Sequence, residues 1–284
     1  MKNRMIALLL SCVISVLSVS AFAEKPLTIV TTIAPLGALV NSIVGERGTV
    51  DVLLENQGSG HHYALTIADR QKLVSADVAL WVGKDLEVFL TKPIQQRLTR
   101  QKAVVTAMDI AAIDWPDSHS NESAHEDHHG HDHGEHDPHV WLNPINNVHI
   151  IDALVKEFVQ IDPANAQYYQ DNAEQQKAQL YALDKRVMDM MAPLQKIPFI
   201  VSHPAYTHFV HRYHLQQADF IAITPEKSSG AKHLVALRQL KQVRCVFNDF
   251  GVQNKKAEQL AQYLNASLAI LDPMGIKGDV STHI

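Results

Sequence analysis

The stretch that most constrains the fold of this chain is residues 164–191, which contain neither glycine nor proline. The stretch is rich in Gln, Ala and Leu and stops before Pro193, so it predicts a single helix. A helix of about 28 residues is about 42 Å long at a rise of 1.5 Å per residue. Such a helix can cross one domain and connect it to another as a stiff strut. The alternative is an ordinary long helix packed within one domain.

Strand and helix patterns alternate on both sides of this stretch. Before it, β-branched and apolar segments predict strands at 27–32, 49–54, 77–82 and 103–107, with helices at 34–44, 66–75 (with Thr66 as its N-cap and Asp69 at the third helical position), 86–100 (interrupted near Pro93) and 145–160. After it, strands are predicted at 199–202, 217–223, 244–247 and 267–271, with helices at 204–214, 230–242 (capped by Ser228 or Ser229) and 254–264. Such alternation is typical of βαβ units with a parallel sheet.

The predicted fold class is therefore α/β, with two lobes. Each lobe has a mostly parallel sheet flanked by helices, and a long rigid helix joins the lobes. The predicted divisions are a signal peptide at 1–23, an N-terminal lobe at 24–144, a helical connector at 145–195 and a C-terminal lobe at 196–284.

The first residues predict export. Met1-Lys-Asn-Arg4 is followed by an apolar run to about Val19, and the small-x-small pattern Ala21-Phe-Ala23 precedes Glu24. This is typical of a secretory signal peptide. The run is shorter than the roughly 20 residues of a spanning helix, which argues against a membrane anchor. A lipoprotein would use Cys12, whose context Leu9-Leu-Ser-Cys12 fits poorly. We therefore expect a periplasmic protein.

Composition excludes several classes of protein. The formal net charge is −5 and the basic residues are scattered, which argues against nucleic-acid binding. Cys12 lies in the predicted leader, so the exported chain retains only Cys245. It can form neither an intramolecular disulfide nor a cysteine-based zinc site.

A polar tract at residues 117–137 carries seven histidines, from His119 to His136, interleaved with Asp and Glu. Imidazole is a common ligand of zinc-like metals, and the carboxylates attract a dication. The tract has too few apolar side chains to build a core, so we predict a mobile, solvated, metal-binding insertion. The alternative is a polar linker without function.

Metal-competent side chains follow four predicted strands, two in each lobe. They are His61 or His62, His139, His203 and Asp272. Ligands of open parallel sheets bind beyond the carboxyl ends of the strands. If the lobes face each other, all four positions meet in one cleft, where three imidazoles and a carboxylate suit four-coordinate zinc. Spacing alone does not choose between the two adjacent histidines. A further trio, His208, His211 and His214, is predicted to be surface or half-buried.

Catalytic motifs are absent from the sequence. It has no HExxH pair, no G-x-S-x-G elbow and no G-x-x-x-x-G-K-[ST] loop. We therefore expect a protein without enzymatic activity. The alternative, a zinc hydrolase, would need an open coordination position and a general base beside the metal.

Five segments together resemble the periplasmic zinc-binding solute-binding proteins of ATP-binding-cassette metal importers (cluster A-I). The segments are Gly60-His-His-Tyr-Ala-Leu65, Ala76-Asp-Val-Ala-Leu-Trp-Val-Gly83, His139-Val-Trp-Leu-Asn-Pro144, Val201-Ser-His-Pro-Ala-Tyr206 and Leu271-Asp-Pro-Met-Gly275. The resemblance covers nearly the whole exported chain.

This resemblance implies a site and a function. The implied zinc ligands are His61, His139 and His203, with Asp272 either the fourth ligand or a neighbour that holds a water ligand. A histidine at position 203 favours zinc over manganese, which agrees with the preference of nitrogen donors for zinc. The implied function is capture of Zn²⁺ in the periplasm by a monomer. It would deliver zinc to an ABC permease, with a periplasmic zinc chaperone as a further partner.

Two alternatives remain open within this fold: a periplasmic zinc buffer or metallochaperone without a transporter, and a member that binds manganese or iron. Because ligand histidines must be neutral, capture should weaken as the pH falls toward about 6.

The sequence departs from the family's pattern in three places. The residue before the first implied ligand is Gly60, where the family has an acidic residue. Where the family has Glu-Pro, this chain has Asn248-Asp249, and we assign Asp249 no role beyond contact with a ligand. The chain stops at Ile284, where the family continues with a helix that often carries a cysteine partner for Cys245. The resemblance thus implies a second lobe without its final helix.

Overall fold

The computed structural model describes residues 25–55, 60–116, 137–225, 227–251 and 255–275. The predicted signal peptide, the histidine tract at 117–136 and the chain end at 276–284 lie outside the described residues. Within the described ranges, no helix combines the length and apolarity that a membrane crossing requires.

The first lobe contains a four-stranded parallel sheet in the order β2-β1-β3-β4. The strands are β1 (Leu27–Ile33), β2 (Gly48–Leu54), β3 (Val78–Trp81) and β4 (Ala103–Thr106). All four match predicted strands to within two residues. Strands β1 and β3, at the centre, are almost fully buried, as parallel strands covered on both faces should be.

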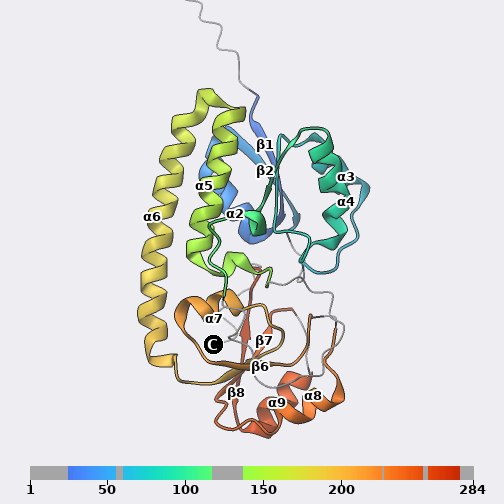
Figure 1. Cartoon of the computed structure of the whole chain (residues 1–284), viewed down its shortest axis with the longest axis vertical. Coiled ribbons are helices and arrows are strands. Elements are labelled where there is room, and N and C mark those ends of the chain that lie inside the picture. Colours follow the sequence, from blue (N-terminus) through green and yellow to red (C-terminus); the bar gives the residue numbers. More distant parts are fainter. Residues whose placement is uncertain (1–24, 56–59, 117–136, 226, 252–254, 276–284) are drawn as a thin grey trace, which may run out of the picture.

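Helices cover both faces of this sheet. Figure 1 shows α3 (Ile67–Ser75) and α4 (Thr91–Thr99) on one side, and α2 (Ala34–Val44), α5 (Pro144–Ile161) and α6 (Ala166–Met191) on the other. The predicted cap of α3 is present, since Thr66 and Asp69 form a capping box. The interruption predicted near Pro93 lies between Leu90 and Thr91, where a 3-10 helix ends and α4 begins. Pro93 itself occupies the first turn of α4, where a missing N–H costs nothing.

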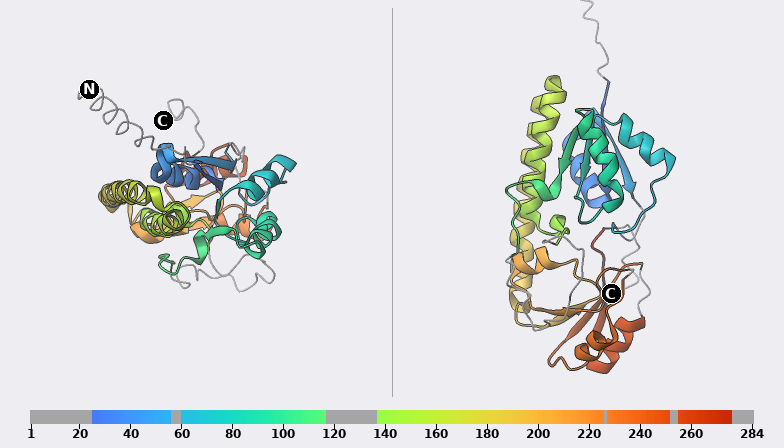
Figure 2. Two further views of the ribbon diagram at one scale, coloured as in Figure 1. Left: turned by 90° about the horizontal axis from the view of Figure 1, so that it is seen from above. Right: turned by 45° about the vertical axis from the view of Figure 1, so that its right-hand side comes forward.

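The long helix α6 has 26 residues and runs beside both lobes (Figures 1 and 2). Tyr169 and Leu180 of its first part belong to the buried apolar cluster of the first lobe, as do α5 residues such as Leu154. Further along α6, the buried Asp184 pairs with Arg212 of the second lobe. The predicted stiff link between the lobes is therefore confirmed.

The second lobe repeats the design with the parallel order β6-β5-β7-β8. Its elements are β5 (Phe199–Val201), α7 (Thr207–Tyr213), β6 (Gln217–Phe220), α8 (Ala231–Leu237), β7 (Cys245–Asp249), α9 (Lys255–Leu264) and β8 (Ser267–Leu271). Helices α8 and α9 cover one face through Leu237 and Leu260, which pack on Ile200 and Val246. Helix α8 ends five residues before the predicted limit. Its N-cap is Gly230, without a side-chain cap, so the predicted serine cap is wrong.

Short 3-10 helices join these elements. They are η2 (Gly45–Arg47), η3 (Val88–Leu90), η4 (Ala107–Asp109), η5 (Val140–Leu142), η6 (Pro163–Asn165) and η7 (Ala192–Leu194). After β8 the chain returns to the other lobe, because Met274 is buried in the apolar cluster of the first lobe. The lobes therefore share a packed boundary at the carboxyl ends of their strands.

Candidate metal centre

Three histidines from three distant segments meet between the lobes. His61 and His139 come from the first lobe and His203 from the second, and one ligand atom from each lies within 4.8 Å of the others. Their ring centroids are 5.5 Å (His61 to His139), 5.6 Å (His139 to His203) and 6.2 Å (His61 to His203) apart. Within the described parts of the chain, no second group of three metal-competent side chains meets this spacing.

His61 rather than His62 belongs to this cluster. His61 is half-buried and its ring faces His139, whereas the side chain of His62 is exposed. The preceding Gly60 is buried, and a Cβ atom placed there would lie 3.1 Å from the side chain of Leu86. A larger residue at position 60 would therefore require the side chain of Leu86 to shift by a few tenths of an ångström.

The ring of His139 is fixed by Asp137. The Nδ1 atom of His139 lies 2.6 Å from the Asp137 carboxylate, which also accepts the backbone N–H of His139 at 3.0 Å. Burial opposes ionisation of Asp137, but its electrostatic interaction and hydrogen bonds with His139 lower its pKa to about 2. An ionised carboxylate only accepts, so Nδ1 carries the hydrogen and Nε2 presents its lone pair to a metal.

His203 has an equivalent partner in Asp249. Its Nδ1 atom lies 2.6 Å from the Asp249 carboxylate, and both side chains are buried. The hydroxyls of Ser202 and Tyr206 also donate to Asp249, the latter at 3.3 Å. These hydroxyl donors hold the Asp249 carboxylate in place, and the carboxylate in turn fixes the imidazole of His203 with Nε2 directed toward a metal.

Register explains why Asp249 faces His203. Strands β5 and β7 are paired with Val201 beside Phe247, so positions 203 and 249 each lie two residues beyond the same pair. The sequence offered one signal, an acidic residue at the end of a strand. Without the register of β5 on β7, the sequence does not show that Asp249 is the partner of His203.

Asp272 lies near the cluster but outside it. Its side chain accepts the backbone N–H of Met274 at 3.0 Å. Burial raises the pKa of Tyr206, and the nearby charge of Asp249 raises it further. The charge of Asp272 also contributes to this rise, so Asp272 lies close to Tyr206. The described geometry therefore groups three imidazoles and leaves Asp272 as a neighbour.

Of the other histidines, His208 differs from prediction. It is fully buried rather than surface or half-buried, while His211 is half-buried and His214 exposed. Helix α7 lies on the boundary between the lobes, and residues of the first lobe bury His208. The sequence of α7 alone does not predict this contact with the other lobe.

The site can hold a dication. Three imidazoles supply nitrogen donors, and the carboxyl groups of Asp137 and Asp249 lie behind two of them. Three nitrogen ligands with a further position for oxygen or water suit zinc. The buried carboxylates raise the basicity of the rings that they orient.

Comparison with known proteins gives one consistent family. A family model described as ZnuA, zinc-uptake complex component A periplasmic, matches residues 29–283. The high-affinity zinc uptake system protein ZnuA of Yersinia pestis is 29% identical over 263 residues, covering 87% of this chain and 83% of its own. The protein of that name from Brucella abortus (strain 2308) is 28% identical over 314 residues, covering 97% and 92%.

Solved structures share the fold. A crystal structure of ZnuA matches with a TM-score of 0.74 at 22% identity, covering 89% of this chain and 93% of its own. A ZnuA deletion mutant with zinc bound matches with a TM-score of 0.75 at 21% identity, covering 89% and 92%.

Proposed function

The chain belongs to the periplasmic zinc-uptake component A family, and on that basis we propose that it captures zinc in the periplasm for delivery to an ABC permease. The family is one of solute-binding transport proteins rather than enzymes. Relatives in Yersinia and Brucella are named as proteins of a high-affinity zinc uptake system, which supports the same role here.

The observation that carries this proposal is the convergence of His61, His139 and His203 within 4.8 Å. In our proposal these three bind zinc through nitrogen, and Asp272 or a water molecule supplies the fourth ligand. Nitrogen donors favour zinc over the harder manganese, which prefers carboxylates and water. A manganese- or iron-binding role is thus the less favoured alternative.

The long helix limits how the lobes move in this proposal. Tyr169 and Leu180 of α6 pack in the first lobe, and Asp184 of the same helix pairs with Arg212 of the second. A helix fixed at both lobes resists wide hinge closure. Binding and release of zinc should therefore involve small sliding of packed elements or local loop changes.

Titration calorimetry of three forms of the protein tests the site. We expect the full chain to bind one zinc ion tightly and several weakly, the weak ones at the histidine tract. Deleting residues 118–136 should remove the weak sites and keep the tight one, whereas His203→Ala should remove the tight site. Loss of tight binding with the tract would contradict the assignment to the cleft.

Growth measurements separate transport from buffering. A strain without this protein should fail to grow when a chelator limits zinc, and the wild-type chain should restore growth. The His203→Ala variant should not. Normal zinc import in the deletion strain would favour a periplasmic buffer or metallochaperone instead.

A further inference from the structure

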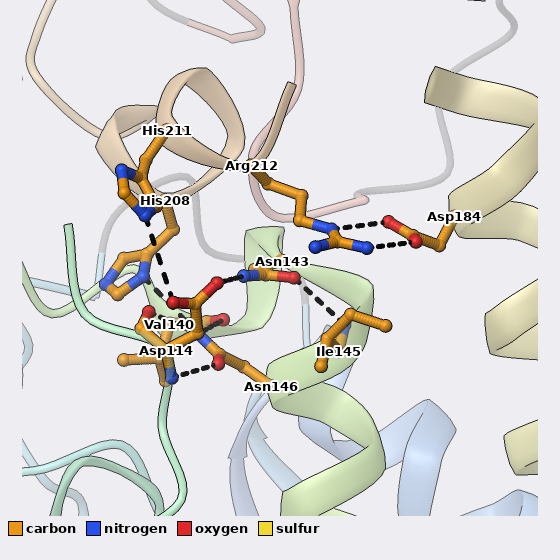
Figure 3. Close-up of polar contacts among 9 residues, drawn as sticks. All are labelled: Asp114, Val140, Asn143, Ile145, Asn146, Asp184, His208, His211 and Arg212. Atoms are coloured by element: carbon orange, nitrogen blue, oxygen red, sulfur yellow. Dashed lines mark hydrogen bonds and ion pairs between the residues drawn. The ribbon is translucent and has the colours of Figure 1, made fainter. Parts of the chain in front are cut away.

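A fully buried histidine of the second lobe, His208, contacts the segment that carries His139. Its Nε2 atom lies 3.0 Å from the backbone carbonyl of Asp137, and its Nδ1 atom lies 3.3 Å from the side-chain amide of Asn146. Figure 3 shows His208 on α7 beside Asn146 of α5, so the contact crosses the boundary between the lobes. Trp115 of the first lobe covers the ring, with centroids 5.4 Å apart.

These contacts define the state of the ring. A backbone carbonyl only accepts, so Nε2 of His208 donates its hydrogen to Asp137. The Nδ1 atom then accepts a hydrogen from Asn146, whose own side-chain oxygen accepts the backbone N–H of Asp114 at 2.7 Å. The Nε2 donor of His208 is therefore satisfied by Asp137, and Nδ1 lies within reach of an amide that also donates to the backbone carbonyl of Val140 at 3.2 Å.

Asp137 is held on three sides. His208 donates to its carbonyl, the backbone N–H of Thr207 donates to its carboxylate at 3.2 Å, and the other carboxylate oxygen holds Nδ1 of His139. Two of these three partners lie in the first turn of α7 in the second lobe, and the third, His139, also donates its backbone N–H to the carboxylate at 3.0 Å. The orientation of His139 therefore depends on an element of the opposite lobe.

We propose that His208 is a positioning residue for zinc: it fixes Asp137 from the second lobe and so keeps the ring of His139 aimed at the metal. This inference rests on the proposed function, in which His139 is a ligand. It also gives a route for release, since a small shift of α7 withdraws the donors of Thr207 and His208 and leaves Asp137 held by His139 alone. Affinity for zinc thereby depends on how the two lobes are placed.

Two variants of similar length separate positioning from packing. His208→Gln places an amide N–H where the Nε2 hydrogen of histidine lies, so it can still donate to Asp137. His208→Met fills a similar volume and offers no donor. A third variant, His208→Asn, is polar but too short to reach Asp137 and replaces the Met variant if that chain does not fold. His214→Asn, on the exposed residue that ends the same helix with φ 54°, is the matched control.

The experiment compares the full-length variants with wild type by zinc competition against a chelator, the visible spectrum with one equivalent of cobalt(II), and thermal unfolding without metal. We expect His208→Met to weaken zinc binding by about tenfold, the lower end of the loss for direct partners of metal ligands, because His208 acts on His139 through Asp137. The cobalt spectrum should change as well. His208→Gln and His214→Asn should retain both properties.

Two results would overturn the proposal. One is unchanged zinc affinity in His208→Met, or in His208→Asn where that variant replaces it. The other is equal weakening in His208→Gln and His208→Met with an unchanged cobalt spectrum, as loss of packing alone would give. His139→Ala distinguishes failure of this proposal from failure of the proposed function. If His139 were not a zinc ligand, His139→Ala would bind zinc as tightly as wild type.

Discussion

The indole N–H of Trp141 donates a 2.8 Å hydrogen bond to the backbone carbonyl of Pro273. Trp141 lies two residues beyond His139 in the first lobe, and Pro273 directly follows Asp272 of the second. The next residue, Met274, is buried in the apolar cluster of the first lobe. One hydrogen bond and one apolar side chain thus tie the loop of Asp272 to the segment of His139.

We expect Trp141→Phe to weaken both folding and zinc binding. The substitution removes the donor and leaves a buried carbonyl unpaired, which costs about 1–3 kcal/mol of unfolding free energy. With that tie lost, the two lobes hold the site less firmly, so zinc should dissociate faster. Urea unfolding of the metal-free protein and stopped-flow transfer of zinc to a chelator measure the two effects.

A tryptophan within one lobe provides the control for that variant. Trp81 is also buried and donates to the hydroxyl of Thr106 at 2.8 Å, but both residues belong to the first lobe. Trp81→Phe should lower the unfolding free energy and leave zinc dissociation unchanged. Equal dissociation rates for the two variants would show that the contact between the lobes has no influence on the site.

Asp249→Asn should weaken zinc binding without disrupting the fold. An amide can still accept from Nδ1 of His203, but it lacks the charge that makes the imidazole more basic. Loss of such a partner typically lowers metal affinity by about 10- to 100-fold. Competition titration with a chelator at neutral pH measures the change in Kd.

The matched control for Asp249→Asn is Asp77→Asn. The Asp77 carboxylate also accepts two hydrogen bonds, from the backbone N–H and the hydroxyl of Thr28, but at the amino ends of the strands. Asp77→Asn should lower the unfolding free energy and leave the affinity for zinc unchanged. If Asp249→Asn bound zinc with wild-type affinity, orientation of His203 by this carboxylate would be unimportant.

The sequence predicted those parts of the fold that depend on local patterns. The structure contains the predicted alternation of strands and helices, the Thr66 cap and the uninterrupted helix α6. Each of these features depends on residues that are close together in the sequence. The placement of histidines after strands also predicted which residues could approach one another, since parallel strands end at the same edge of a sheet.

What the sequence could not supply depends on distant pairings. The partnership of His203 with Asp249 follows from the register of β5 on β7, which involves residues more than 40 positions apart. The burial of His208 requires knowledge that Trp115 and Asn146 of the other lobe cover it. Both features depend on tertiary packing, so the hydrophobic periodicity of a single segment does not predict them.

His61→Ala and His62→Ala form a matched pair that tests the first ligand. Their side chains are adjacent, but only His61 faces His139 and His203. Removing a direct ligand should cost more than removing a partner of one, so His61→Ala should weaken zinc binding by more than about 100-fold. His62→Ala should bind normally in the same chelator competition, and a reversed result would assign the ligand to His62.

Glu87 makes stability depend on pH, independently of zinc. Its side chain is fully buried, and it accepts the backbone N–H groups of Val82 at 2.8 Å and Gly83 at 3.1 Å. Burial raises the pKa of Glu87 from 4.5 to about 7. Because the folded pKa exceeds the unfolded one, the stabilising contribution is complete below pH 4.5 and is lost as the pH rises through 7. The loss is at most about 3 kcal/mol.

Glu87→Gln stays neutral at every pH, so it should lack this dependence. Between pH 5 and pH 8, the unfolding free energy of the metal-free wild type should fall relative to that of Glu87→Gln by up to about 3 kcal/mol. Other titrating groups, histidines included, are common to both chains and cancel in the difference. The exposed Glu46 serves as control, since Glu46→Gln should follow the wild-type curve. Parallel curves for wild type and Glu87→Gln, measured by urea unfolding across this range, would show that Glu87 titrates at its ordinary pKa.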